Sequence, residues 1–335
     1  MPEIVRACVY GWAMSSAPVR DTAPPPWPSG TRLVPRIMPR VAAGIAAAVA
    51  AVGVHLMWLF FVNSAAGQRI DRAAFEGALF QQGRLWQLAR PILDVVSYTL
   101  IIGTAIAAVV IAALRKRVLL ALEVLLLIGG ANLTTQVIKG IYDRPHLLPG
   151  WVGPNSLPSG HTTVAASVSM ALLLVVPRKS RPLVALVGAA WTIAIGLSTM
   201  VGRWHRPADV IAAVLVVFAW SAGICAATSY HTMDAVADGP TTNLDRLNRW
   251  PYRLTTTVSR SSWAIGIGMT VLAAIGLAIW LVVVWRLLAA SPDVSNYYVT
   301  AYGGGAAGVV AFTLGCFAAL LLIRQATGAP RSVDI

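Results

Sequence analysis

Residues 157–163 read Leu-Pro-Ser-Gly-His-Thr-Thr and lie between two strongly apolar segments, 118–138 and 161–176. A Ser-Gly step in front of an apolar run predicts the first turn of a helix, here at the edge of a membrane span. A helix start presents free backbone N–H groups and the positive end of the helix dipole, so it attracts anions such as phosphate. The stretch therefore predicts a membrane helix with an anion site at its first turn.

The composition around this stretch is that of a membrane protein. Of 335 residues, 57% are hydrophobic and only 12% are charged, whereas a soluble domain carries about 25% charged residues. The apolar residues form blocks long enough to cross roughly 30 Å of hydrocarbon as helices. The predicted fold is an all-α polytopic membrane helical bundle. Its eight expected spans are 41–63, 92–114, 118–138, 161–176, 183–200, 208–230, 263–288 and 301–323.

The basic residues indicate the orientation of this bundle. The net charge of +13 comes mostly from Lys and Arg in the loops before spans one, three, five and seven and after span eight. These loops share one side if eight spans alternate, and the positive-inside rule makes that side the cytoplasm. Basic loops beside anionic lipid headgroups need no nucleic acid as a partner. We expect a multi-pass protein of a bacterial plasma membrane with both termini cytoplasmic.

The expected organisation has five parts. They are a disordered cytoplasmic tail (1–40), a six-helix core (41–230), a cytoplasmic loop (231–262), two additional transmembrane helices (263–323) and a second cytoplasmic tail (324–335). Within the core, segment 64–91 predicts a surface amphipathic helix that forms part of the entry to a site. In the last span, Gly304 and Gly308 form a Gly-x-x-x-Gly step, which predicts close helix packing or, alternatively, a homodimer.

A titratable pair stands at the start of the sixth span. Pro207 favours the first turn of a helix, which places His205 just before the helix and Asp209 within its first turn. Asp209 can accept the Nδ1 hydrogen of His205 and leave Nε2 as a nucleophile. The simpler interpretation is that Asp209 caps the helix and His205 is an interfacial side chain.

Two further clusters lie on the same predicted side of the membrane. His161 is placed to donate a proton, behind Ser159 as a helix cap or phosphate ligand and Gly160 as a close backbone approach. Lys139 ends span three, and Arg144 follows it with a planar fork suited to phosphate. Lys139 can instead extend to the headgroups. Arg203 is a further candidate for the phosphate site.

Joined in this order, the clusters resemble the type 2 phosphatidic acid phosphatase (PAP2) superfamily of membrane lipid phosphatases. The family pattern is Lys-x6-Arg-Pro, then Pro-Ser-Gly-His, then Ser-Arg-x5-His-x3-Asp. The second part matches at residues 158–161, and the third matches at Ser198, His205 and Asp209. The chain departs from the pattern at two arginine positions, where it has His146 and Thr199. Arg144 and Arg203 stand near them.

The resemblance implies a role for each matching residue. His205 is the nucleophile and forms a phosphohistidine, Asp209 orients it, and His161 protonates the leaving group. Lys139, Arg144, Ser159 and Gly160 hold the phosphate oxygens, with Arg203 as a possible replacement for the missing family arginine. The family needs no metal or other cofactor, and the chain has no acidic cluster that suggests one.

The sequence thus predicts a membrane phosphatase whose site lies on the extracytoplasmic face. The expected substrate is a lipid phosphate or pyrophosphate: phosphatidic acid, phosphatidylglycerol phosphate or a polyprenyl (pyro)phosphate. One alternative is a lipid phosphotransferase that uses the same site. Another is a non-catalytic lipid-binding membrane protein, which the shifted arginines favour and the two positioned imidazoles oppose.

Overall fold

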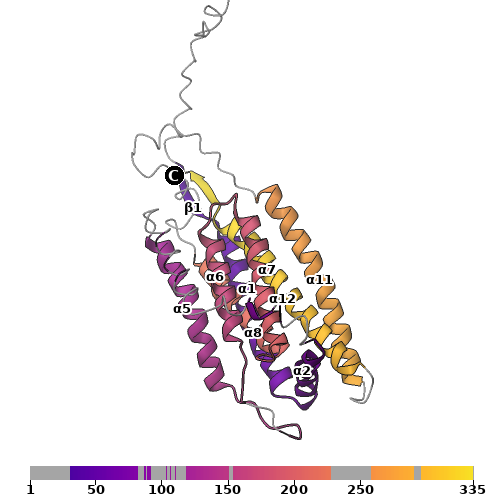
Figure 1. The fold of residues 1–335 in the computed structure, drawn as a ribbon. Helices are drawn as coiled ribbons and strands as arrows, with labels where there is room; N and C mark the ends of the chain where they lie inside the picture. The colour runs from indigo at the N-terminus through magenta and orange to yellow at the C-terminus, as the bar shows by residue number, and fades with distance from the viewer. Residues whose placement is uncertain are drawn as a thin grey trace, which may run out of the picture.

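The computed structural model describes residues 31–81, 87, 89–91, 103, 106, 110, 118–150, 154–227, 258–289 and 296–334. Within these residues, six helices are long and apolar enough to cross a membrane, and a seventh apolar helix is shorter. The six are α1 (Ile37–Met57, continued by the π-helical turn η1, Trp58–Val62), α5 (Val118–Ile141), α7 (Arg181–Val201), α8 (Pro207–Ala226), α11 (Arg260–Ala289) and α12 (Tyr297–Thr327). The shorter one is α6 (Gly160–Val175). The all-α polytopic bundle is confirmed (Figure 1).

Seven of the eight expected spans correspond to these seven helices. The second, 92–114, lies outside the described residues except for three scattered positions. The terminal helices extend beyond their predicted limits, since α1 begins at Ile37 and α12 covers Tyr297–Thr327. Apolar content identifies the part of a helix in hydrocarbon, whereas the helix itself continues into the interface.

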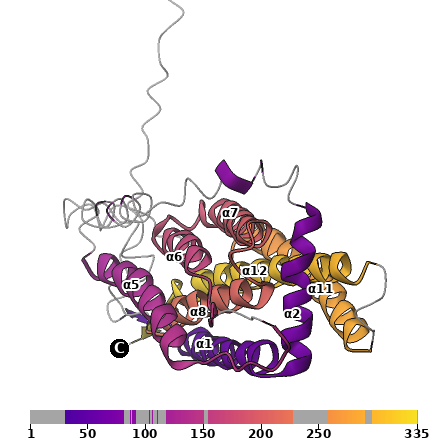
Figure 2. The same ribbon diagram turned by 60° about the horizontal axis from the view of Figure 1, so that its bottom comes forward.

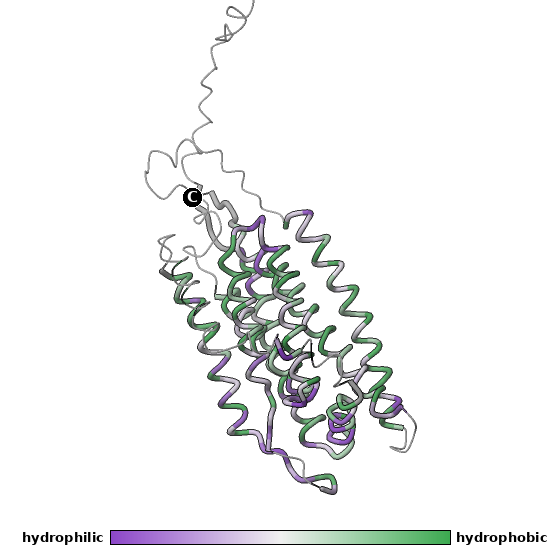
Figure 3. The backbone as a smooth tube through the Cα atoms, in the orientation of Figure 1, coloured by the Kyte–Doolittle hydropathy of each residue, from purple (hydrophilic) through white to green (hydrophobic). Residues whose placement is uncertain are grey.

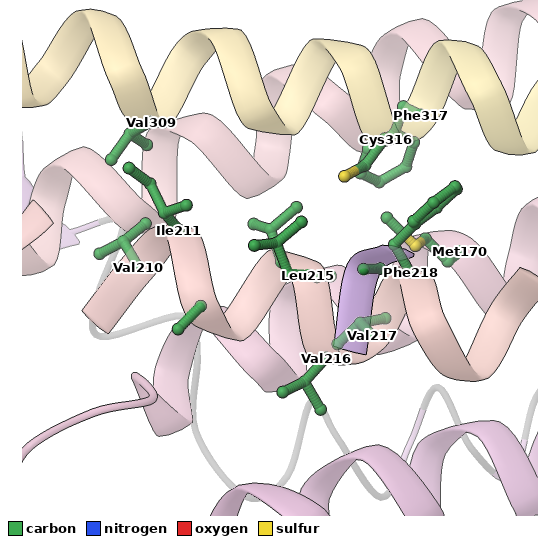
Figure 4. Close-up of a cluster of buried hydrophobic side chains, with 14 of the residues drawn as sticks. Met170, Val210, Ile211, Leu215, Val216, Val217, Phe218, Val309, Cys316 and Phe317 are labelled. Carbon is green, nitrogen blue, oxygen red and sulfur yellow. The ribbon is translucent and has the colours of Figure 1, made fainter. Parts of the chain in front are cut away.

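Helix α8 is the centre of the bundle. In its most apolar stretch 78% of the residues are buried, against 22% for α11 at the periphery. It packs against α1, α5, α6 and α12. Figure 4 shows its side chains Ile211, Leu215 and Phe218 in a core shared with Met170 of α6 and Phe317 of α12. The helix that carries Asp209 is therefore held from several sides.

Glycines of α12 allow the last two helices to join this core. A Cβ atom at Gly305 would lie 2.4 Å from Cγ of Pro207, the first residue of α8, and one at Gly308 would lie 2.7 Å from the Trp280 ring of α11. The glycine-rich face is thus occupied by neighbours within the chain. Close packing, the first of the two expectations for this step, is what the structure has.

Helix α2 (Ala65–Gly77) follows η1 and runs across one end of the bundle (Figure 2). Its first residue is capped by Ser64, whose hydroxyl accepts the amide hydrogen of Gly67. The expected amphipathic helix is present, and a short 3-10 turn, η2 (Ala78–Gln81), ends it. The expected surface location is only half right, because Gln68 and Asp71 are buried against the bundle. Hydrophilic residues lie at both ends of the bundle, including this one, and hydrophobic residues lie along the helices between them (Figure 3).

The opposite end carries a small β-ribbon. Strand β1 (Thr31–Pro35) pairs antiparallel with β2 (Pro330–Asp334), with Leu33 opposite Ser332. The sequence predicts a disordered tail for the first segment and a cytoplasmic tail for the second, and in the structure the two segments form paired strands. A five-residue strand is stable only when a partner strand satisfies its backbone groups, and that partner lies at the far end of the chain. Residues 1–30 and most of 231–262 lie outside the described part.

We expect Gly305→Ala to destabilise the protein and Gly303→Ala not to. The new Cβ at 305 would overlap Pro207, so α8 or α12 must shift, at a cost of about 1–3 kcal/mol for an overpacked site. At Gly303 a Cβ meets nothing within 4 Å, so the exchange only improves helix propensity. Thermal unfolding of the purified variants in detergent measures both. Equal melting temperatures for the two variants would contradict this packing.

Candidate active site

The start of α6 is built by the cap that the sequence predicts. The Ser159 hydroxyl accepts hydrogen bonds from the amide and the hydroxyl of Thr162, at 3.3 and 3.0 Å. Ser159 is fully buried, and its own amide donates to the backbone oxygen of Asp209 at 2.9 Å. This last bond ties the first turn of α6 to the first turn of α8. Ser159 therefore caps α6 and also holds it against α8.

The start of α8 holds the expected His–Asp pair. His205 Nδ1 lies 3.3 Å from Oδ2 of Asp209, a carboxylate with no exposed surface. The same oxygen accepts the Arg206 amide at 3.0 Å and the Ser156 hydroxyl at 2.7 Å. A carboxylate that receives Nδ1–H leaves Nε2 of the imidazole with its lone pair, as a nucleophile requires.

The turn from α7 to α8 sets the position of the His205 ring. The amides of Trp204 and His205 both donate to the backbone oxygen of Thr199, at 2.9 and 3.3 Å. Arg203 has a positive φ of 56°, which reverses the chain tightly between the helices. The His205 side chain is left 11% exposed. It is thus anchored on Asp209 and still open on one side.

The two imidazoles meet at this end of the bundle. The ring centroids of His161 and His205 are 6.4 Å apart with an interplanar angle of 62°, and the His161 ring also packs on Trp204 at 5.3 Å. Rings this close can touch opposite sides of one phosphorus centre. The structure thereby brings together residues from α6 and α8 that are 44 positions apart (205 − 161).

Two of the expected cations come from α5 and the loop that follows it. Lys139 Nζ lies 3.9 Å from where a Cβ at Gly160 would be, which places the ammonium group beside the start of α6. The Arg144 side chain is 2% exposed, and its Nη2 lies 3.8 Å from Oδ2 of Asp71. Nε and Nη2 of Arg144 are buried and have no hydrogen-bond partner in the described part of the chain. These N–H groups are available to an anion.

The two departures from the family pattern have clear structural consequences. His146 is exposed on the loop, and the buried Thr199 donates its hydroxyl hydrogen to the Gly196 backbone oxygen at 2.7 Å. Arg203 places its guanidinium 4.7 Å from the centre of the Phe75 ring in α2. Of the expected cations, the structure places Lys139 beside the start of α6 and Arg144 beside Asp71. A phosphate contact by Arg203 stays a prediction.

Three residues of this cluster were missed from the sequence. Ser156 and Arg206 bond to one another at 3.1 Å, and Ser156 bonds to Asp209. Asp71 of α2 is 1% exposed and accepts the Ala208 amide at 3.3 Å. Arg206 was discoverable as the neighbour of His205. Nothing in the spacing of α2 points to Asp71, because its contacts lie more than 70 residues away in the chain.

Burial changes the pKa of Asp71 and Arg144, which lie outside the membrane spans. Burial, together with the nearby Asp209 carboxylate, raises the pKa of Asp71 from 3.8 to about 7, although Arg144, Arg206 and the Ala208 amide oppose this rise. Burial also lowers the pKa of Arg144, which remains a cation at neutral pH.

Across the described residues there is no group of three or more His, Cys, Asp and Glu side chains that could hold a metal ion.

The raised pKa of Asp71 predicts how stability changes with pH. Between pH 4 and 7 the folded protein holds a proton on Asp71 that the unfolded chain has lost, so this group stabilises the fold at low pH. That stability is lost as the pH rises through about 7. Between pH 5 and 8 we expect the wild type to lose stability relative to Asp71→Asn, by a few kcal/mol at most.

Thermal unfolding at the two pH values measures this difference. Glu76→Gln is the matched control, since Glu76 lies on the same helix, with its side chain 32% exposed in a surface pair with Arg72. Parallel pH profiles for wild type and Asp71→Asn would show that Asp71 titrates normally.

Comparison with known proteins places part of this chain in a family. The model of the PAP2 superfamily matches residues 120–233, which include α6, α7, α8 and most of α5 and carry Lys139, Arg144, His161, His205 and Asp209 but not Asp71. Comparisons with curated proteins and with solved structures gave no match. The resemblance identified from the three motifs is confirmed to this extent: residues 120–233 of this multi-pass helical bundle match the model of the PAP2 superfamily, whose members are phosphatases.

Proposed function

We propose that this protein hydrolyses a lipid phosphate or pyrophosphate through a phosphohistidine intermediate. The observation that carries the proposal is that the rings of His161 and His205 lie with their centroids 6.4 Å apart and that His205 is bonded to Asp209. A site that only bound phosphate would need cations and backbone amides. It would have no use for two imidazoles of which one is oriented by a buried carboxylate.

In the first step, Nε2 of His205 attacks phosphorus, and the bond from phosphorus to the leaving oxygen breaks. The protonated His161 gives its proton to that oxygen, so the lipid departs as an alcohol or, from a pyrophosphate, as a monophosphate. The positive charge that develops on the His205 ring is stabilised by Asp209 through Nδ1. The phosphoryl group is then on Nε2.

In the second step, the now neutral His161 takes a proton from water, and the water oxygen attacks phosphorus. The N–P bond breaks, its electron pair returns to His205, and inorganic phosphate leaves. Lys139, Arg144 and the Gly160 amide hold the phosphate oxygens throughout, because negative charge on them must be matched in both transition states. Ser159 serves as the cap that fixes the Gly160 amide.

A lipid substrate suits the location of the cluster. The residues come from the C-terminal end of α5 and the N-terminal ends of α6 and α8, at the end of the bundle where α2 lies (Figures 1 and 2). The outer faces of α1, α5 and α11 expose large apolar side chains, such as Val49, Leu133 and Ile275. A headgroup can reach the imidazoles while its acyl or prenyl tail stays in the bilayer.

The expected orientation supports an extracytoplasmic site. The basic residues Arg178 and Lys179, which follow α6, and Arg324, in the last turn of α12, lie at the end of the bundle opposite the imidazoles. The positive-inside rule makes that end cytoplasmic. A phosphotransferase would use the same first step and replace water by an acceptor alcohol, so a product assay with added acceptor lipid separates the two activities.

Replacing His205 with Ala should abolish turnover. Without the nucleophile we expect phosphate release from phosphatidic acid, phosphatidylglycerol phosphate and polyprenyl pyrophosphate to fall by roughly a thousandfold or more. The assay is phosphate release by the purified protein across this lipid panel. His146→Ala is the control, since that histidine is exposed and should leave turnover unchanged. Retained turnover in His205→Ala would defeat the mechanism.

Replacing His161 with Ala should separate the two chemical steps. With a lipid substrate we expect a loss of about 10²- to 10⁴-fold, the usual value of general acid catalysis. With p-nitrophenyl phosphate the leaving group needs no proton, so the first step should survive while the second fails. The expected result is a burst of one p-nitrophenol per protein and an acid-labile phosphoprotein. Equal losses with both substrates and no burst would remove His161 from the acid role.

A further inference from the structure

One face of helix α2 contacts the loop that carries Arg144. Three of its residues, spaced i, i+3 and i+4 on one helix face, contact this loop in succession. Gln68 donates to the Pro145 backbone oxygen at 2.7 Å, Arg72 donates to the Pro149 backbone oxygen at 3.0 Å, and Asp71 faces the Arg144 guanidinium at 3.8 Å. We call this face the α2 clamp. Residues 142–147, which include Arg144, have no regular secondary structure of their own.

Asp71 joins the loop to the catalytic helix. One of its oxygens accepts the amide of Ala208, in the first turn of α8, at 3.3 Å, and the other faces Arg144. Among the described residues, Asp71 and Asp209 are the buried acidic side chains. The carboxyl groups of both residues contact the first turn of α8, where helix N–H groups favour negative charge.

A purely structural role does not account for a carboxylate at this place. Acidic side chains are rarely buried unless they are paired, since desolvation of the charge is costly. Arg144, Arg206 and Asp209 face Asp71, and the last of these opposes its ionisation. An uncharged acceptor such as Asn or Ser would satisfy the Ala208 amide at a lower cost. The carboxyl group, which ionises near pH 7, is better explained by the cation that it faces.

We propose that Asp71 is a positioning residue, which holds the Arg144 guanidinium so that its buried N–H groups meet the phosphate oxygens. The inference rests on the proposed phosphatase function and adds to it a residue outside the three motifs. Arg144 reaches the site from a loop, two positions before the family arginine. A loop arginine keeps one orientation only if a fixed partner holds it, and Asp71, on a helix packed against the bundle, is that partner.

The test is a double-mutant cycle on the full chain in detergent, with inorganic orthovanadate as the phosphate mimic. Asp71→Asn should weaken vanadate inhibition and binding about tenfold, within the usual range for directly interacting residues. Arg144→Ala should weaken them at least as much. If Asp71 acts through Arg144, the double variant should be no weaker than Arg144→Ala alone. Glu76→Gln, which removes the same charge from the surface of α2, should bind vanadate as the wild type does.

Two outcomes would overturn the inference and leave the phosphatase proposal standing. One is unchanged vanadate binding in Asp71→Asn, and the other is the same loss from Asp71→Asn in the Arg144→Ala background. If the wild type neither binds vanadate nor releases phosphate from any lipid of the panel, both proposals fail. Asp71→Ser, which can still accept the Ala208 amide hydrogen, repeats the cycle with a second uncharged side chain if Asp71→Asn does not fold.

Discussion

The buried carboxylate of Asp209 is the interaction on which this end of the molecule depends. One of its oxygens accepts three hydrogen bonds, from His205, Ser156 and the Arg206 amide. An ionised carboxylate inside a protein is tolerated only when such donors replace water. The same donors come from the residue before α8 and the segment before α6, so satisfying the charge also assembles the site. The hydrogen bonds to Asp209 thus cap helix α8 and also orient the His205 imidazole.

A second layer of contacts holds the start of α8 from outside. Gly305 of α12 lets that helix approach Pro207, and Asp71 of α2 accepts the next amide of α8, that of Ala208. Neither helix belongs to the region that the family model matches. The two C-terminal helices therefore have a structural role in the core, because α12 packs on α7 and α8 as well as on α11. In the proposed mechanism two imidazoles contact one phosphorus centre, and a site of this kind needs rigid support.

The arginines show how a site can keep its charge while its sequence changes. The two positions where the family pattern has arginine hold an exposed His146 and a buried Thr199, and neither offers a cation to the imidazoles. Positive charge comes instead from Arg144 and from Arg206, which bonds to Ser156 beside Asp209. A guanidinium on a long side chain reaches the same place from a different backbone position. Each shifted arginine then needs a different partner to hold it.

Local sequence determined most of the architecture. Apolar blocks predict membrane helices because each span must satisfy its own backbone hydrogen bonds in hydrocarbon. The Ser159 cap, Pro207 at a helix start and the His205–Asp209 spacing involve neighbours within a few residues, so the motifs could be read directly. The helix in 64–91 was also predicted, though not the direction of its polar face.

What only the tertiary structure decided are the contacts between distant segments. Asp71 and Ala208 are 137 residues apart, and Ser156 and Asp209 are 53 apart. No periodicity records such pairs, because they depend on how helices pack across the end of the bundle. The same holds for the glycine face of α12. The sequence allowed either a second chain or the same chain as its partner, and the fold places Pro207 and Trp280 against it. The sequence specified the reactive groups and their helices, and packing alone decided which charges hold them in place.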